Sequence, residues 1–228
     1  MSIKAFFLDF YGTVVHEDGE IISKICNQIK DNSKTEATLT EIGGFWWKEF
    51  SNLFQESYGE TFRTQRVLET ISLKNTLSNF GSTLDENILS ELMYNHWMQP
   101  SIFDDSLEFF KQNNVPVYIL SNIDNFDVNT AIAYHKLKVK EVITSEDVQS
   151  YKPRPEMFEK ALKLCNLSKD EVLHVGDSLS SDVSGAMNVG IKSVWINRNN
   201  KEFKGKDEPN YTINKLDELL KFEMLVKN

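Results

Sequence analysis

Five short runs of hydrophobic residues occur along the chain, and each ends at a polar or turn-forming residue. They cover residues 3–8, 115–120, 142–144, 171–175 and 193–196. Runs of this length bounded by turn residues are typical of buried strands. We therefore expect at least four strands that are buried on both faces, with 142–144 as a short fifth.

Helical spacing of hydrophobic residues fills the intervals between these runs. It predicts helices over 106–113, 155–164 and 182–188, and a docking helix over 215–225. Pro155 suits the first turn of its helix. Strands that alternate with helices indicate a parallel sheet covered on both sides. The predicted fold is α/β, with a Rossmann-like parallel sheet at its core.

The segment from about residue 16 to residue 100 has a different pattern. It shows no clear strand, and its spacing predicts four helices, over 21–29, 41–54, 65–80 and 86–97. We expect residues 1–15 and 100–228 to form the sheet core and residues 16–99 to form an inserted helical cap domain. The aromatic cluster Phe45-Trp46-Trp47 is expected to be cap core, with an apolar substrate pocket as the alternative.

Composition narrows the range of partners. The formal net charge is -9, which argues against a basic nucleic-acid surface. The two cysteines lie in no metal-binding pattern, and the start of the chain lacks the layout of a signal peptide. We expect a cytoplasmic protein with a small-molecule substrate and no nucleic-acid or membrane partner. The oligomeric state is left open.

Three polar residues stand at the ends of predicted strands. Asp9, Ser121 and Asp177 each follow a hydrophobic run. Functional groups gather beyond the carboxyl ends of parallel strands, so these residues are expected to share one site. His174 lies inside a predicted strand and is expected to be a packed histidine.

Four short motifs occur in a recognisable order. They are Asp9-Phe10-Tyr11-Gly12-Thr13, Ser121-Asn122, Lys152 within Tyr151-Lys152-Pro153, and Gly176-Asp177-Ser178 followed by Asp182. In this order the chain resembles the haloacid dehalogenase-like hydrolases with a helical cap after the first motif. The resemblance implies that Asp9 is a nucleophile that forms a covalent aspartyl intermediate. It also implies that Lys152 is catalytic, and that the substrate contacts Tyr11, Gly12, Thr13, Ser121 and Asn122.

The fourth motif resembles that of the magnesium-dependent members. The resemblance implies Mg²⁺ bound by Asp9, the main-chain carbonyl of Tyr11, Asp177 and Asp182. Mg²⁺ prefers such hard oxygen ligands. A purely structural alternative is that Asp182 caps the helix that follows it.

Tyr11 departs from the pattern of the phosphatases. They usually carry a second Asp here, which protonates the leaving oxygen, whereas the 2-haloacid dehalogenases of the family carry tyrosine. The dehalogenases also use a cap arginine, for which Arg63 and Arg66 are candidates. We therefore expect a Mg²⁺-dependent phosphatase for a small phosphorylated metabolite. The alternatives are a metal-independent 2-haloacid dehalogenase and a catalytically weak binding protein on the same fold.

Overall fold

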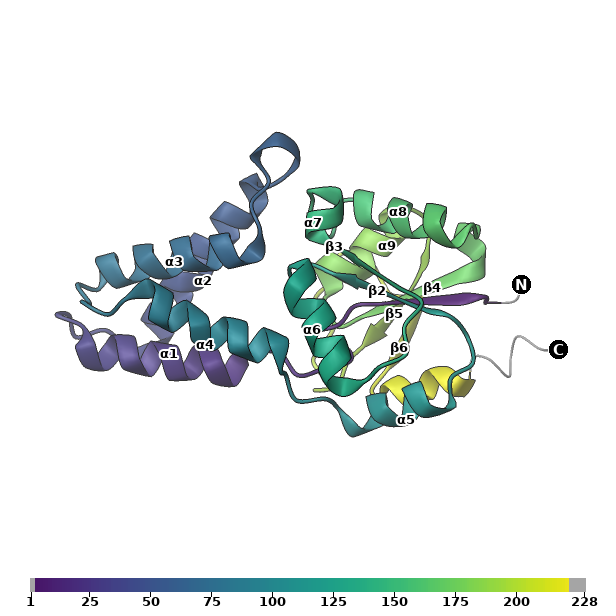
Figure 1. The fold of residues 1–228 in the computed structure, drawn as a ribbon, viewed down its shortest axis with the longest axis horizontal. Coiled ribbons are helices and arrows are strands. Elements are labelled where there is room, and N and C mark those ends of the chain that lie inside the picture. The colour runs from purple at the N-terminus through teal and green to yellow at the C-terminus, as the bar shows by residue number, and fades with distance from the viewer. Residues whose placement is uncertain (1–2, 222–228) are drawn as a thin grey trace. The chain divides into compact units, whose positions relative to one another are not determined.

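The computed structural model describes residues 3–221, and the chain divides into two compact units (Figure 1). The division falls between Glu17 and Asp18 and again between Gln99 and Pro100. The larger unit contains the sheet, and the smaller unit is helical. The first boundary lies two residues beyond the position expected from the sequence.

A six-stranded parallel sheet forms the larger unit, in the order β3-β2-β1-β4-β5-β6. The strands are β1 (Ala5–Leu8), β2 (Val117–Ser121), β3 (Glu141–Thr144), β4 (Val172–Gly176), β5 (Lys192–Ile196) and β6 (Tyr211–Ile213). The predicted α/β fold is thus confirmed, including the five hydrophobic strands. Edge strand β6 was not predicted, because only one of its three residues is buried and no hydrophobic run marks it.

Helices connect these strands. They are α5 (Asp104–Gln112), α6 (Asn125–His135), α7 (Ser145–Val148), α8 (Glu156–Cys165) and α9 (Gly185–Asn188). Shorter turns are η2 (Lys169–Glu171), the π-helical turn η3 (Leu179–Ser184) and η4 (Leu216–Glu218). Helices α6 and α7 were not predicted from the sequence. Of the docking helix predicted over 215–225, η4 is described, and the part from residue 222 onward lies outside the described residues.

Strand β1 is buried on both faces, as its continuous hydrophobic run requires. Ala5 and Phe7 face one side, where they join Phe158 of α8 in a buried cluster. Phe6 faces the other side, with its ring centroid 5.9 Å from that of Phe109 in α5. Figure 1 shows α8 and α9 on one side of the sheet and α5 on the other. Burial of each large side chain contributes about 1.5–3 kcal/mol, so the central strand is held firmly from both sides.

The smaller unit is a bundle of the four helices expected from the sequence. They are α1 (Gly19–Asn32), α2 (Leu39–Glu56), α3 (Gln65–Asn79) and α4 (Glu86–Met98), with a short turn η1 (Gly59–Thr61). Each helix packs against the next, and α1 also packs against α4. Thr38 and Glu41 form a reciprocal capping box that fixes the start of α2.

The aromatic cluster on α2 divides between core and surface. Trp46 is 5% exposed, and its indole N–H donates to Ser72 Oγ on α3 at 3.1 Å. Trp47 is 69% exposed and stacks beside Phe50, with ring centroids 6.1 Å apart. The expectation of cap core therefore holds for Trp46 and fails for Trp47, because consecutive helical residues point about 100° apart.

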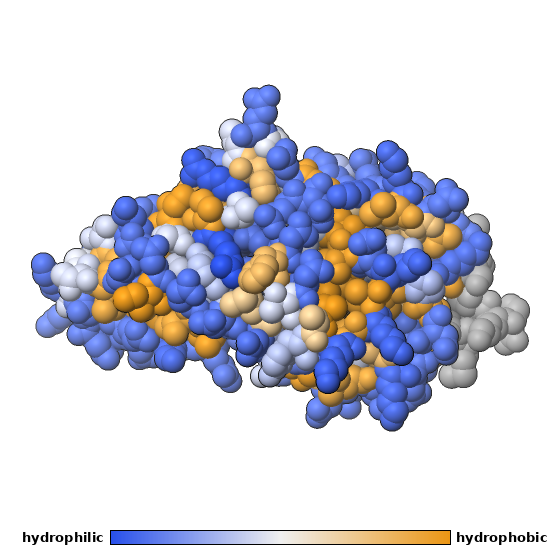
Figure 2. Space-filling model, viewed as in Figure 1, coloured by the Kyte–Doolittle hydropathy of each residue, from blue (hydrophilic) through white to orange (hydrophobic). Residues whose placement is uncertain are grey.

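Hydrophilic residues cover most of the face shown in Figure 2, and the hydrophobic residues between them gather in several patches. Within residues 3–221, no helix combines the length and the hydrophobicity needed to span a bilayer.

Glu69 on α3 gives a test of the bundle interior. Its side chain is 4% exposed, and its Oε1 has no hydrogen-bond partner within the described residues. Burial, with a smaller effect of Asp18, raises the pKa of Glu69 from 4.5 to about 8. Because the folded-state pKa is the higher one, Glu69 costs stability progressively as the pH rises from about 4.5 to about 8.

We expect Glu69→Gln to raise the free energy of unfolding at pH 8 by roughly 1–3 kcal/mol and to change it little near pH 4.5. Urea unfolding at both pH values measures this, with the exposed Glu36→Gln as control. An equal effect of Glu69→Gln at the two pH values would contradict the assignment.

Candidate active site

Asp9 emerges directly from the central strand. Its backbone N–H donates to the carbonyl of Val175 at 2.9 Å, which ties it to the end of β4. The carbonyl of Phe10 accepts from the N–H groups of Val14 and Val15, at 2.8 and 3.0 Å, so the chain turns sharply after the strand. The Asp9 carboxylate is therefore held at the carboxyl edge of the sheet and is 9% exposed.

Lys152 lies at the centre of the site and is buried. Its Nζ donates to Asp9 Oδ1 at 2.8 Å, to Asp182 Oδ1 at 2.6 Å and to the carbonyl of Leu120 at 2.8 Å. These three acceptors use all three ammonium protons. Burial lowers the pKa of Lys152, but the carboxylates of Asp182 and Asp9 outweigh that effect and raise it. The ammonium group is therefore a permanent positive charge.

Ser121 and Asn122 lie at the end of strand β2, and Asn122 contacts the backbone of Lys152. Asn122 Oδ1 accepts from the backbone N–H of Lys152 at 2.8 Å, and its amide donates to the Lys152 carbonyl at 3.3 Å. The Asn122 side chain therefore holds the lysine backbone, and a substrate contact of Asn122 stays a prediction. Ser121 Oγ accepts from the N–H of Ile123 at 3.2 Å, an arrangement that leaves the Ser121 hydroxyl proton for another acceptor.

Asp182 is fully engaged in hydrogen bonds. Its Oδ1 accepts from Lys152 and from His174 Nε2 at 3.0 Å, and its Oδ2 accepts from the N–H of Ser178 at 3.2 Å. Burial raises the pKa of Asp182, but Lys152 and His174 outweigh it and bring the pKa to about 2. A Cβ at Gly176 would lie 2.1 Å from Asp182 Cγ, so only glycine permits this close approach.

Asp177 has no such support. Its carboxylate has no hydrogen-bond or ion-pair partner within residues 3–221. Burial, followed by the nearby charges of Asp9, Asp182 and Glu17, raises the pKa of Asp177 to about 8. Gly12 adopts a φ of +88°, and a Cβ there would lie 2.7 Å from Asp177 Cγ. The turn after Asp9 thus packs directly against Asp177.

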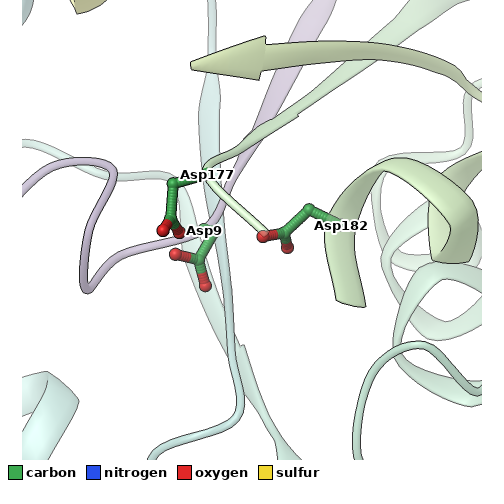
Figure 3. Close-up of side chains that lie close together, drawn as sticks. All are labelled: Asp9, Asp177 and Asp182. Atoms are coloured by element: carbon green, nitrogen blue, oxygen red, sulfur yellow. The ribbon is translucent and has the colours of Figure 1, made fainter. Parts of the chain in front are cut away.

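The three carboxylates form one acidic cluster. Asp9, Asp177 and Asp182 each offer an oxygen, and these oxygens lie within 4.8 Å of one another (Figure 3). One buried ammonium cannot neutralise three carboxylates, and burial also raises the pKa of Asp9, to about 6. A hard divalent cation fits this oxygen set, and Asp177 is the member that has no other partner among the described residues. Tyr11 lies in the same turn and pairs with Val15 in an isolated bridge.

Thr13 ends the first motif and is completely buried. Its carbonyl accepts from Arg198 Nη2 at 2.6 Å, and its hydroxyl has no hydrogen-bond partner within the described residues. Arg198 in turn donates from Nη1 to both carboxylate oxygens of Asp105, at 2.9 Å each. Thr13 therefore anchors the turn, and the expectation that it contacts substrate finds no support in its burial.

Two residues of this network were not recognised as part of the site in the sequence. His174 is packed, as expected, but it also donates to Asp182 across eight residues of chain. A strand residue facing the π-helical turn has no distinctive sequence pattern. Arg198 follows β5 in a polar loop, and its contact with Thr13 joins residues 185 positions apart. Neither position was detectable without the fold.

Known proteins resemble this chain over most of its length. A family model described as haloacid dehalogenase-like hydrolase matches residues 3–190. The (S)-2-haloacid dehalogenase of Pseudomonas fluorescens is 25% identical, covering 96% of this chain and 95% of its own. Pyrophosphatase PpaX of Bacillus mycoides (strain KBAB4) is also 25% identical, covering 81% and 92%.

A solved structure has the same fold. The HAD-hydrolase YfnB from Bacillus subtilis, bound to magnesium, superposes with a TM-score of 0.77 at 18% identity. The match covers 98% of this chain and all of that chain (100%). Together, the sequence comparisons show that relatives of this chain include both dehalogenases and phosphatases.

The charge imbalance of the acidic cluster predicts a measurable response to metal. We expect Asp177→Asn to raise the melting temperature in chelator, because it removes a half-buried carboxylate that has no partner within residues 3–221. We also expect added Mg²⁺ to raise the melting temperature of the natural protein and not that of Asp177→Asn.

Thermal unfolding followed by circular dichroism, with and without Mg²⁺, provides the measurement. The exposed Asp170→Asn in the same unit is the matched control for loss of one charge. A Mg²⁺ response that survives Asp177→Asn would show that the cation binds elsewhere.

Proposed function

Because the chain belongs to the haloacid dehalogenase-like hydrolase family, we propose that it is a Mg²⁺-dependent phosphatase that acts on a small phosphorylated metabolite through an aspartyl-phosphate at Asp9. The observation that carries the proposal is the carboxylate of Asp177, which has no partner in the described part of the chain and has an oxygen within 4.8 Å of oxygens of Asp9 and Asp182. A metal-independent displacement at Asp9 has no use for this additional negative charge. A bound cation would turn that charge into a ligand.

Asp9 acts as the nucleophile in this proposal. A carboxylate oxygen of Asp9 attacks phosphorus, an O–P bond forms, and the leaving oxygen departs with the electron pair of the broken bond. Water then attacks the aspartyl-phosphate, which releases phosphate and restores the carboxylate. Lys152, already bonded to Asp9 Oδ1, holds this carboxylate in one orientation and offsets the charge brought by the substrate.

The surrounding residues orient the substrate and the cation. The hydroxyl of Ser121 donates to a phosphoryl oxygen, and Asn122 keeps Lys152 in place through its backbone. Asp9, the Tyr11 carbonyl and Asp177 are the proposed ligands of Mg²⁺, which would stabilise charge on the transferring phosphoryl group. Asp182 acts through Lys152 and the Ser178 N–H, because both of its oxygens already accept hydrogen bonds.

A 2-haloacid dehalogenase is the second candidate. It is favoured by Tyr11 and by the similarity to the P. fluorescens dehalogenase along nearly the whole chain. Asp9 would then attack the carbon that bears the halogen, and the halide would leave with its electron pair and without a proton. Of the two candidate arginines of the smaller unit, Arg66 lies over the ring of Tyr94, 4.2 Å from its centroid.

One pair of assays separates the two candidates. We expect phosphate release from p-nitrophenyl phosphate that requires Mg²⁺ and is abolished by Asp9→Asn. Asp177→Asn should lower this activity by at least about 10²-fold, because it removes a proposed cation ligand. The dehalogenase predicts instead chloride release from 2-chloropropionate in chelator, with little effect of Asp177→Asn. Chloride release without phosphate release would reject the phosphatase.

Tyr11 gives a second prediction within the phosphatase reaction. An unperturbed phenol, with a pKa of about 10, is a poor substitute for a carboxylic acid that protonates the leaving oxygen. Tyr11→Asp should therefore raise turnover of alkyl phosphates by about 10²-fold or more while changing aryl phosphates less. Tyr11→Phe is the control, since it removes the hydroxyl without adding a carboxylate. If Tyr11→Asp loses activity on both substrate classes, the explanation that Tyr11 leaves the site without an efficient general acid is wrong.

A further inference from the structure

A pocket opens beside Asp177 within the larger unit, with a volume of about 830 Å³. Its wall includes Asp177 and Ser178 after β4, Trp195 on β5, and several residues of the loop over 201–206. Because Asp177 belongs to the acidic cluster and also lines the pocket, the pocket adjoins the place where the phosphoryl group would bind.

Three lysines border this pocket in a chain whose net charge is -9. Lys204 pairs with Glu202, with Nζ and Oε2 3.5 Å apart. The ammonium groups of Lys201 and Lys206 have no carboxylate partner within the described residues. With Asp177 neutralised by a cation and Glu202 paired with Lys204, the described residues of the pocket present two unpaired ammonium groups and one remaining carboxylate, that of Glu17.

The loop that carries these lysines is anchored at its base. Asn197 Oδ1 accepts from the Lys201 N–H at 2.8 Å, and its amide donates to the Lys201 carbonyl at 2.9 Å. The Trp195 indole donates to the Asp177 carbonyl at 2.9 Å, and the Phe203 ring packs edge-on against Trp195, with centroids 6.2 Å apart. These contacts hold the lysine loop against the strand end that carries Asp177.

We propose that this pocket binds a second anionic group of the substrate, a phosphate or a carboxylate, through Lys201 and Lys206. The inference rests on the proposed phosphatase function and specifies its substrate class as phosphorylated compounds that carry another negative charge. Ammonium groups form charge-assisted hydrogen bonds with both kinds of anion. The hydroxyls of Ser178 and Ser180, which also line the pocket, supply further donors.

The kinetic test compares three substrates: phenyl phosphate, 4-carboxyphenyl phosphate and inorganic pyrophosphate. The double variant Lys201→Gln, Lys206→Gln should lower kcat/KM for the last two, relative to phenyl phosphate, by about tenfold. Differences in leaving group cancel, because each ratio is compared between variants. The control is Lys138→Gln, Lys163→Gln, which removes the same charge from exposed lysines of the same unit that do not line the pocket.

The outcomes separate the possibilities. A change confined to the pyrophosphate ratio identifies a phosphate as the second group, and one confined to the carboxyphenyl ratio identifies a carboxylate. Ratios that stay constant, or that change equally in the control variant, would overturn the proposal and mark the lysines as ordinary surface charges.

A binding measurement keeps the inference separate from the reaction. Calorimetric titration of Asp9→Asn with pyrophosphate in Mg²⁺ requires no turnover. We expect the affinity for pyrophosphate to fall about tenfold when Lys201→Gln and Lys206→Gln are added to Asp9→Asn, and to stay unchanged when the two control substitutions are added. This result would support anion binding in the pocket even if all three substrates resist hydrolysis and the proposed function fails. Affinity that is the same in both variants, or absent in both, argues against it.

Discussion

The ammonium group of Lys152, buried between Asp9 and Asp182, is the interaction on which the rest of the site depends. Removing a single partner from a buried ion pair typically costs about 3–5 kcal/mol, because the remaining charge is left unpaired. Around this group, Asn122 holds the lysine backbone, His174 holds Asp182, and the glycine at 176 leaves room for the contact. Burial raises the pKa of Asp9 to about 6, Lys152 offsets part of that effect, and its hydrogen bond fixes the direction of the Asp9 carboxylate.

Asp177 and Tyr11 favour different reactions in the same site. Asp177 adds a carboxylate that the buried lysine does not neutralise, which favours a cation and therefore phosphoryl transfer. The phenol of Tyr11 is too weak an acid to protonate a poor leaving group efficiently, which favours halide departure or activated phosphates. Aryl and acyl phosphates are substrates whose cleavage is compatible with both Asp177 and Tyr11. Their leaving oxygens tolerate negative charge, so a cation-assisted site can act on them without a carboxylic acid at position 11.

The sequence predicted what local patterns encode and missed what depends on distant contacts. The strand-end placement of Asp9, Ser121 and Asp177 followed from hydrophobic runs, because parallel strands end on one edge. Helix α6 was missed, since its hydrophobic residues follow no clear stripe, and the outward direction of Trp47 depends on the exact start of its helix. The hydrogen-bonding roles of Asn122 and Arg198 depend on segments 30 and 185 residues away, which no local pattern records.

The central position of β1 has a consequence for synthesis of the chain. Ala5–Leu8 is synthesised well before its two neighbours in the sheet, which begin at Val117 and Val172. Throughout the synthesis of residues 18–99, this hydrophobic segment has no strand to pair with, whereas the four helices can pack through short-range contacts. The nascent chain therefore exposes an unpaired hydrophobic strand segment after the helical bundle can already fold. This segment is a suitable binding site for a chaperone that recognises extended hydrophobic peptides.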